Sequence, residues 1–131
     1  MLDIFDILGP VMVGPSSSHT AGAVRIGRMA RTLLDGRPVR AEIGLYGSFA
    51  ETGRGHGTDR ALVAGLLGMA PDNLEVPNSF AIAAEQGLEF AFQTVQLRDA
   101  HPNTAVLDVT AEDGHRLVLR AVSTGGGRIR V

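Results

Sequence analysis

The chain has 131 residues, 44% of them hydrophobic, and carries a formal net charge of −2 at pH 7. This length and apolar content suit one domain with a single core, while the slightly negative charge and the 5% of aromatic residues argue against nucleic acid as a partner. Cysteine is absent, which excludes disulfides, thiolate catalysis and a cysteine-bound cluster held by this chain alone.

The first segment that forms a regular pattern is a helix predicted over residues 23–34. Its apolar positions fall on one face and its arginines on the other. Gly22 and Gly27 flank the apolar face, where another backbone can approach closely. Residues 1–6 lack the basic start of a secretory signal, and no apolar run reaches the roughly 18 residues that span a bilayer. We therefore expect a cytoplasmic protein that does not enter a membrane.

The middle of the chain alternates between strand and helix patterns. Apolar residues at every second position predict a strand over residues 39–46, which is expected to run directly into a glycine-rich loop, residues 53–59. Two short helices are predicted after that loop, over residues 61–67 and 79–86, each followed by a glycine.

The last third of the chain is expected to form strands. Residues 90–97 and 105–110 are rich in apolar and β-branched residues, and Asp113-Gly114 predicts a two-residue hairpin turn before a strand at residues 117–119. This order of elements predicts an α/β or α+β fold, a single domain in which helices pack mainly on one face of a mixed β-sheet.

A first candidate site is the segment Gly-Pro-Ser-Ser-Ser-His-Thr at residues 14–20, where the chain enters its first helix. Unpaired N–H groups at a helix start attract an anion, and His19 can exchange protons near neutral pH. One hydroxyl suffices to cap a helix, so the others are candidates for ligand binding, with a flexible capping loop as the alternative. The hydroxyl candidates are Ser16, Ser17, Ser18 and Thr20.

A second candidate site is the loop at residues 53–59, which has three glycines within five residues around His56. Glycines let the main chain approach a ligand, and a plain turn rarely needs three of them. Thr58 or Asp59 can cap the following helix, and Asp59 can instead orient the imidazole of His56 and raise its basicity. The candidates from this loop are Gly55, His56, Gly57, Thr58 and Asp59.

His101-Pro102-Asn103 is a third candidate, although proline and asparagine are also ordinary turn residues. His115 is expected to be a solvated surface residue. Because no two histidines have the close spacing of a metal-binding motif, we expect no metal site in this chain.

Three segments resemble the β chain of the iron–sulfur-dependent L-serine dehydratases. They are residues 5–22 (FDILGPVMVGPSSSHTAG), residues 46–59 (YGSFAETGRGHGTD) and His101-Pro102-Asn103, and the similarity extends over nearly the whole chain. The resemblance implies that L-serine is converted to pyruvate and ammonia by a two-part enzyme. Its α component carries a 4Fe-4S cluster on cysteines, so this chain alone is expected to be inactive and to need that cysteine-bearing partner.

The resemblance also implies roles for the two loops, which would face the cluster across the interface between the components. One iron acts as a Lewis acid on the hydroxyl of serine. His56 is expected to transfer a proton, positioned by Asp59 or Thr58, although His19 stays open as the base. The remaining expected substrate contacts are Ser16, Ser17, Ser18, His19, His101 and Asn103.

Two departures from the family pattern limit these expectations. Family β chains usually continue past the glycine triplet at residues 125–127 into a small regulatory ACT-type domain, which this sequence lacks. Glu51 is more acidic than the residue expected there, and its carboxylate would repel a substrate carboxylate or assist His56.

Two alternative functions remain. The same fold type resembles the allosteric substrate-binding domain of some phosphoglycerate dehydrogenases, so the domain could bind a small carboxylate such as serine without catalysis. A phosphate-binding loop of a kinase at residues 14–18 lacks the expected lysine motif. For the dehydratase interpretation we expect a homo- or hetero-oligomer.

Overall fold

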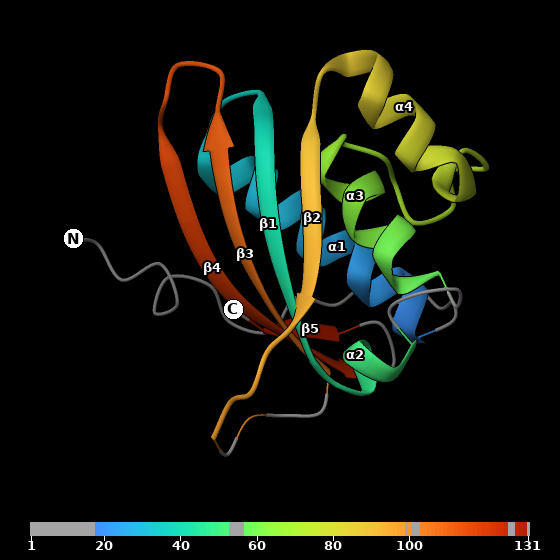
Figure 1. Ribbon diagram of the computed structural model, residues 1–131. Coiled ribbons are helices and arrows are strands. Elements are labelled where there is room, and N and C mark those ends of the chain that lie inside the picture. The colour runs from blue at the N-terminus through green and yellow to red at the C-terminus, as the bar shows by residue number, and fades with distance from the viewer. Residues whose placement is uncertain (1–17, 53–56, 99, 101–102, 126–127, 131) are drawn as a thin grey trace.

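The computed structural model describes residues 18–52, 57–98, 100, 103–125 and 128–130 (Figure 1). The elements in chain order are α1 (Ser18–Leu34), β1 (Pro38–Gly47), α2 (Ser48–Thr52), α3 (Thr58–Leu66), the 3-10 turn η2 (Val76–Asn78), α4 (Ser79–Gln86), β2 (Glu89–Thr94), β3 (Asn103–Ala111), β4 (Arg116–Gly125) and β5 (Arg128–Arg130). Among these described helices, none is long and apolar enough to cross a membrane.

The strands form one five-stranded sheet in the order β2-β1-β3-β4-β5. β2 runs parallel to β1, and the other neighbours are antiparallel. At the centre, Ile43 of β1 lies opposite Phe92 on one side and Leu107 on the other. The long helices α1, α3 and α4 lie on one side of the sheet (Figure 1). The predicted mixed sheet with helices mainly on one face is therefore confirmed.

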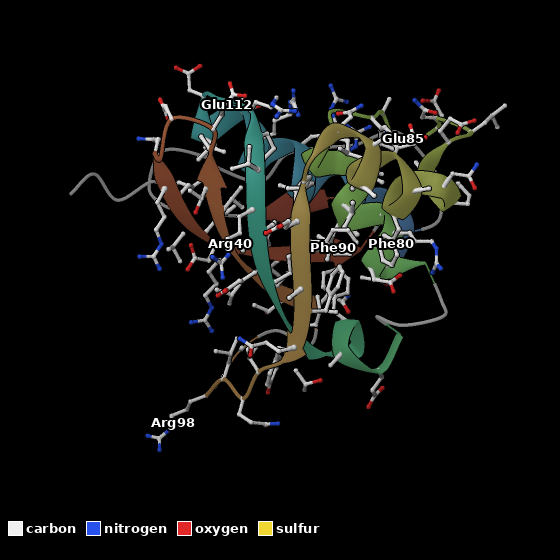
Figure 2. The ribbon with its side chains drawn as sticks, turned by 45° about the horizontal axis from the view of Figure 1, so that its top comes forward. Arg40, Phe80, Glu85, Phe90, Arg98 and Glu112 are labelled. Carbon is white, nitrogen blue, oxygen red and sulfur yellow. The ribbon has the colours of Figure 1, made fainter. Side chains whose placement is uncertain are left out.

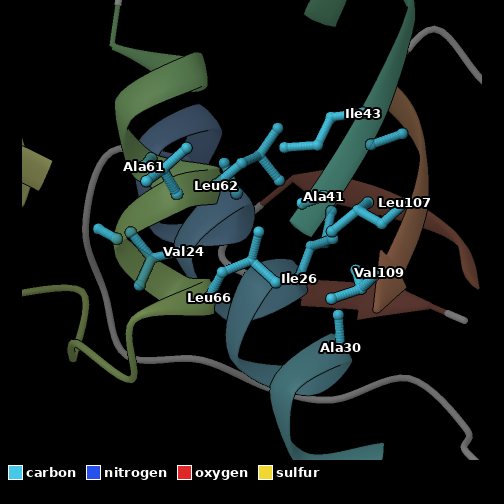
Figure 3. Packing of buried hydrophobic residues seen from close by; sticks show 14 of the residues in the cluster. Val24, Ile26, Ala30, Ala41, Ile43, Ala61, Leu62, Leu66, Leu107 and Val109 are labelled. Atoms are coloured by element: carbon cyan, nitrogen blue, oxygen red, sulfur yellow. The ribbon is translucent and has the colours of Figure 1, made fainter. Parts of the chain in front are cut away.

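The core fills the space between the sheet and the helices α1 and α3 (Figure 3). Ile26 and Ala30 of α1 are fully buried, as are Ile43 and Leu107 from neighbouring strands. Burying each large side chain of this kind contributes about 1.5–3 kcal/mol. Because these residues recur with helical spacing in α1 and at alternate positions in the strands, the sequence pattern predicts this core correctly.

The helices α1 and α3 cross at two glycines. A Cβ atom added at Gly27 would come within 2.8 Å of the backbone nitrogen of Leu66, and one at Gly65 within 2.7 Å of the backbone nitrogen of Arg28. The close backbone approach predicted at Gly27 is thus confirmed. Arg31, predicted on the polar face of α1, is instead half-buried, and its Nη1 donates a hydrogen bond of 2.8 Å to the Leu66 carbonyl at the end of α3.

Two boundaries near the candidate loops differ from the prediction. α1 begins at Ser18, five residues earlier than the apolar pattern indicates, because its first turn is polar and carries no apolar periodicity. The predicted direct passage from β1 into the glycine-rich loop is wrong, because the helix α2 intervenes. Phe49 of α2 is fully buried. One buried residue in a five-residue helix forms no repeating pattern, so hydrophobic periodicity does not predict this helix.

Two boundaries in the sheet also differ. β2 ends at Thr94 rather than at residue 97, and the last bond to its neighbour runs from the Val95 amide to the Leu45 carbonyl. The predicted two-residue hairpin turn is a longer loop, in which the Ala111 amide donates to the His115 carbonyl. Gly114, with φ of 92°, takes the left-handed position that a three-residue hairpin loop requires.

Candidate functional site

The candidate site lies at the end of the sheet where the parallel strands β1 and β2 finish. β1 ends at Gly47 and continues into α2, and Asn103 begins β3 directly opposite Gly47. Ligands of sheets with parallel strands bind outside the carboxyl ends of those strands. The fold therefore brings Asn103 to the end of the sheet where such a ligand is expected.

The N-termini of α1 and α3 lie at this same end. Residues later in α1 contact residues later in α3 or just after it. Val24 and Gly27 contact Gly65, whereas Arg31 contacts Leu66 and Gly68. Both helices consequently run in the same direction, and their first turns lie together near α2 (Figure 1). Each helix start carries the positive end of a helix dipole, so the pair favours an anion between them.

The start of α3 is built from Gly57, Thr58 and Asp59. Gly57 has φ of 94° and ψ of −12° and precedes the helix without a side-chain cap, so neither Thr58 nor Asp59 occupies the predicted cap position. Instead, Oδ1 of Asp59 accepts a hydrogen bond of 2.7 Å from the Arg60 amide and lies 3.7 Å from Nη1 of Arg60. Asp59 therefore stabilises the first turn of α3 as a residue of the helix itself and not as its N-cap.

Helix α4 supports this first turn from behind. Oγ of the fully buried Ser79 donates a hydrogen bond of 2.7 Å to the Arg60 carbonyl. The Arg60 guanidinium lies 4.8 Å from the centre of the Phe80 ring, which is 4.7 Å from the ring of Phe90 in β2 (Figure 2). These contacts fix the position of α3 relative to the sheet.

The predicted site residues fall into three groups. Ser16, Ser17, Gly55, His56 and His101 lie outside the described residues. Ser18, His19 and Thr20 form the first turn of α1 rather than a loop. Within the described part of the chain, Thr58 and Asp59 are buried, while Asn103 is half-buried. The structure thus brings together the first turn of α1, the start of α3 and Asn103 at one end of the sheet.

A cavity at this end was not predicted from the sequence. It has a volume of about 260 Å³ and lies between α2 and the ends of β1 and β2. Its lining residues are Leu45, Ala50, Glu51, Phe92, Gln93 and Thr94. Glu51 is exposed and places an anionic group at the rim of this cavity. The unusual acidic residue at position 51 was the signal in the sequence for this place. The cavity itself was not predicted, because it depends on helix α2, which the sequence pattern did not indicate.

Within the described ranges, no three residues among His, Asp and Glu lie close enough to hold a metal ion.

Comparisons with known proteins agree on one family. A family model described as serine dehydratase beta chain matches residues 1–87. The chain is 47% identical over 128 residues to the "Probable L-serine dehydratase, beta chain" of Bacillus subtilis and 43% identical over 128 residues to the "L-serine dehydratase, beta chain" of Peptoniphilus asaccharolyticus. The two alignments cover 98% and 97% of this chain, and each covers 58% of the relative.

A similarity to longer proteins is confined to part of the chain. "L-serine dehydratase 2" of Escherichia coli is 40% identical over 82 residues, which cover 58% of this chain and 18% of that protein. The chain thus spans somewhat more than half the length of the beta chains that it matches and a smaller share of this longer dehydratase.

Proposed function

The chain belongs to the serine dehydratase beta chain family, and from this premise we propose that it is the β component of an iron–sulfur-dependent L-serine dehydratase. That enzyme eliminates water from L-serine to give pyruvate and ammonia. Residues 1–131 would form the β-chain domain. The observation that carries the proposal is the meeting of two helix N-termini beside the ends of β1 and β2, at segments that lie inside the family match.

The cluster itself does not fit this chain. A 4Fe-4S cluster is held by cysteine thiolates, and the sequence contains no cysteine. We therefore place the cluster on a cysteine-bearing α component, and no role assigned below depends on it. The end of the sheet that carries the helix N-termini would face that component and be completed by it.

The first turn of α1 is the proposed anchor for the substrate carboxylate. Backbone N–H groups at a helix start bind an anion, and the dipole of a helix adds about 0.3–1 kcal/mol at an exposed end. The hydroxyls of Ser16, Ser17, Ser18 and Thr20 and the imidazole of His19 would supply further donors. Asn103, which begins β3 at this end of the sheet, would line the same site together with His101.

The loop before α3 is the proposed source of the base. Elimination of water requires that the Cα proton of serine is removed while the β-hydroxyl departs, and His56 would accept that proton. Gly55 and Gly57 let the main chain pass close to the substrate. Because the Asp59 carboxylate already accepts the Arg60 amide, we assign Asp59 and the buried Thr58 to positioning the loop rather than to proton transfer.

The proposal is tested by assembling this chain with its cysteine-bearing partner without oxygen and measuring pyruvate formed from L-serine. His56→Asn should lower kcat and kcat/KM together by about a hundredfold or more, because a general base is lost. His115→Asn is the matched control, since His115 lies on the hairpin loop at the opposite end of β3 and should leave both constants within about twofold.

A fully assembled pair that forms no pyruvate would overturn the enzyme assignment. If the pair is active but His56→Asn keeps full turnover at saturating serine, and the isolated chain binds serine by calorimetry, the domain is a non-catalytic module for a small carboxylate.

A further inference from the structure

Ser123 of β4 is a buried polar residue whose hydroxyl has no hydrogen-bond partner in the described part of the chain. The residue is 1% exposed, and its Oγ is one of two buried side-chain atoms of this kind among the described residues. The other, Nε of Arg25, belongs to a side chain with two further nitrogens. Because a hydroxyl that leaves water without gaining a hydrogen bond costs free energy, such groups are nearly always paired.

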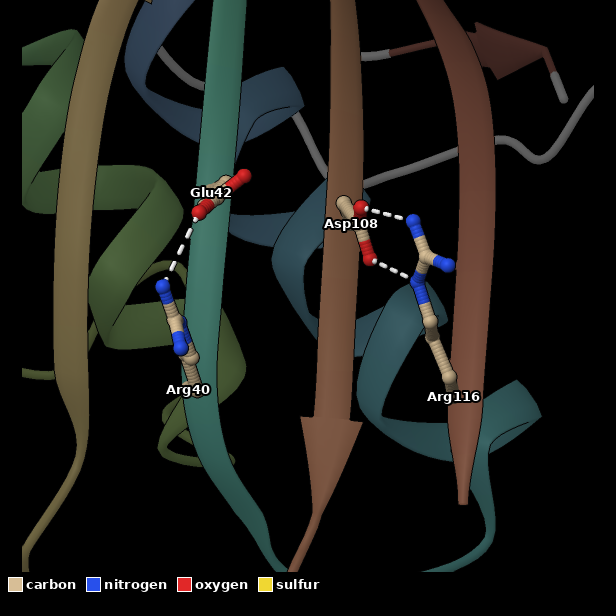
Figure 4. A network of polar contacts seen from close by, with 4 residues as sticks. All are labelled: Arg40, Glu42, Asp108 and Arg116. Carbon is tan, nitrogen blue, oxygen red and sulfur yellow. Dashed lines mark hydrogen bonds and ion pairs between the residues drawn. The ribbon is translucent and has the colours of Figure 1, made fainter. Parts of the chain in front are cut away.

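Two polar contacts elsewhere in the fold show the usual pairing. Oγ of the fully buried Ser79 donates a hydrogen bond of 2.7 Å to the Arg60 carbonyl. On the face of the sheet away from the helices, Nε and Nη2 of Arg116 donate hydrogen bonds of 2.8 and 2.6 Å to the carboxylate of Asp108 (Figure 4). The hydroxyl of Ser123 therefore calls for a partner from outside the described residues.

Ser123 lies beside Asn103 on the side of the sheet that carries the helices. The register pairs Ala105 of β3 with Ala121 of β4, and both alanines are buried in the core. Two residues further along, the same register places Asn103 opposite Ser123, on the same face because side chains alternate along a strand. Ser123 is thus a direct neighbour of a residue that is proposed to line the substrate site.

The first turn of α1 lies over the same part of β4. α1 packs against β4 and β5, and its far end reaches the hairpin end of the sheet, where the Glu112 amide donates a hydrogen bond of 2.9 Å to the Arg37 carbonyl. A helix of 17 residues is about 25 Å long, and β3 spans about 27 Å from Asn103 to Ala111. α1 therefore begins at the end of the sheet where Ser123 lies.

The start of α1 can approach the strands closely. Ala21, Gly22 and Ala23 follow its first turn and are all buried, and none has a side chain longer than a methyl group. The N–H groups of the first turn lack partners within the helix and, together with the helix dipole, favour an anion. An anion at this position has the buried hydroxyl of Ser123 on its strand side.

We propose that Ser123 is a further substrate-binding residue, whose Oγ donates a hydrogen bond to the carboxylate of L-serine at the start of α1. The inference rests on the proposed function and deepens it, since Ser123 lies beyond residues 1–87, which the family model matches. A carboxylate accepts several hydrogen bonds, so the helix start and Ser123 can bind it together. Substrate binding then supplies the partner that the buried hydroxyl lacks in the free chain.

Removal of this hydroxyl should weaken substrate binding without weakening the fold. In the enzyme assembled with its cysteine-bearing partner, Ser123→Ala should raise KM for L-serine by about tenfold or more, because a hydrogen bond to a charged group is lost. kcat should stay within about threefold, because the carboxylate is bound equally in the ground state and the transition state. The urea midpoint of the free chain should not fall, since no hydrogen bond within the described fold is lost.

Two matched variants separate binding from packing. Ser79→Ala removes a hydroxyl that is just as buried but has a partner, so it should lower the urea midpoint where Ser123→Ala does not. Thr110→Val removes a hydroxyl near the hairpin end of β3, away from the site, and should leave KM within about twofold.

Three outcomes would contradict the inference. An assembled wild-type pair that forms no pyruvate would overturn the proposed function and this inference with it. An active pair in which Ser123→Ala keeps the wild-type KM would overturn this inference alone, and the hydroxyl would then bind a buried water molecule only. A higher KM together with a fall in urea midpoint as large as that of Ser79→Ala would make Ser123 a packing residue.

Discussion

At the scale of single residues, the start of α3 depends on the backbone of Gly57. Its φ of 94° lies in the left-handed region, where a side chain costs about 1–2 kcal/mol. Glycine adopts this conformation without strain, and Gly57 directly follows His56, which is the residue that we propose as the base. A side chain at position 57 would therefore disturb the backbone directly beside the proposed base.

Gly57→Ala should lower the free energy of unfolding by about 1–2 kcal/mol and should also lower kcat/KM of the assembled enzyme. Gly114→Ala is a matched control, because Gly114 has φ of 92°, has no atom within 4 Å of an added Cβ, and lies on the distant hairpin. Urea denaturation should show a similar loss for both variants, while the pyruvate assay should respond only to Gly57→Ala. Equal effects of the two substitutions on kcat/KM would contradict the role of Gly57 in the site.

At the scale of elements, the pairing of α1 with α3 brings the two helix starts together. The helices touch through backbone at Gly27 and Gly65, where neither position has room for a Cβ. Arg31 then caps the last turn of α3 through the Leu66 carbonyl. This crossing fixes how the first turn of α1 lies relative to the start of α3.

Gly27→Ala should destabilise the chain by about 1–3 kcal/mol, because the added methyl group meets backbone that cannot move away without separating the helices. This loss outweighs the gain of about 1 kcal/mol in helix propensity. Thr32→Ala, on the exposed face of α1, should change stability by no more than about 0.5 kcal/mol. Thermal or urea unfolding checks both, and a Gly27→Ala variant as stable as Thr32→Ala would show that the helices tolerate a wider spacing.

The sequence predicts a helix or strand well where an apolar pattern repeats along it. It predicts one poorly where a single tertiary contact determines the local structure. Periodicity finds α1, α3, α4 and β1, and α4 matches its predicted range, residues 79–86. It misses α2, because one buried phenylalanine makes no period, and it extends β2 too far, because β1 turns away into α2. Because of these two errors, the sequence did not predict the cavity beside Glu51, which lies where α2 meets the end of β2.

At the scale of the whole molecule, the topology separates two surfaces. One end of the sheet collects the helix starts and Asn103, while the face of the sheet that no described helix covers carries the ion pairs Arg40–Glu42 and Arg116–Asp108 (Figure 1). The parallel pairing of β1 with β2 was not predictable from strand patterns alone, since it depends on the crossover through α2, α3 and α4. The candidate segments were found from their composition, but the meeting of the first turns of α1 and α3 at one end of the sheet follows from the crossing of these two helices (Figure 1).

The central claim is that both helix entrances act on one molecule of serine, and a double-mutant cycle on the assembled enzyme tests it most directly. His19→Asn, His56→Asn and the double variant are compared by kcat/KM for L-serine. If both loops contact one substrate, each single change lowers kcat/KM and the effects are non-additive by more than about 0.5 kcal/mol. A His19→Asn variant with unchanged kcat/KM, or two effects that simply add, would contradict a shared site.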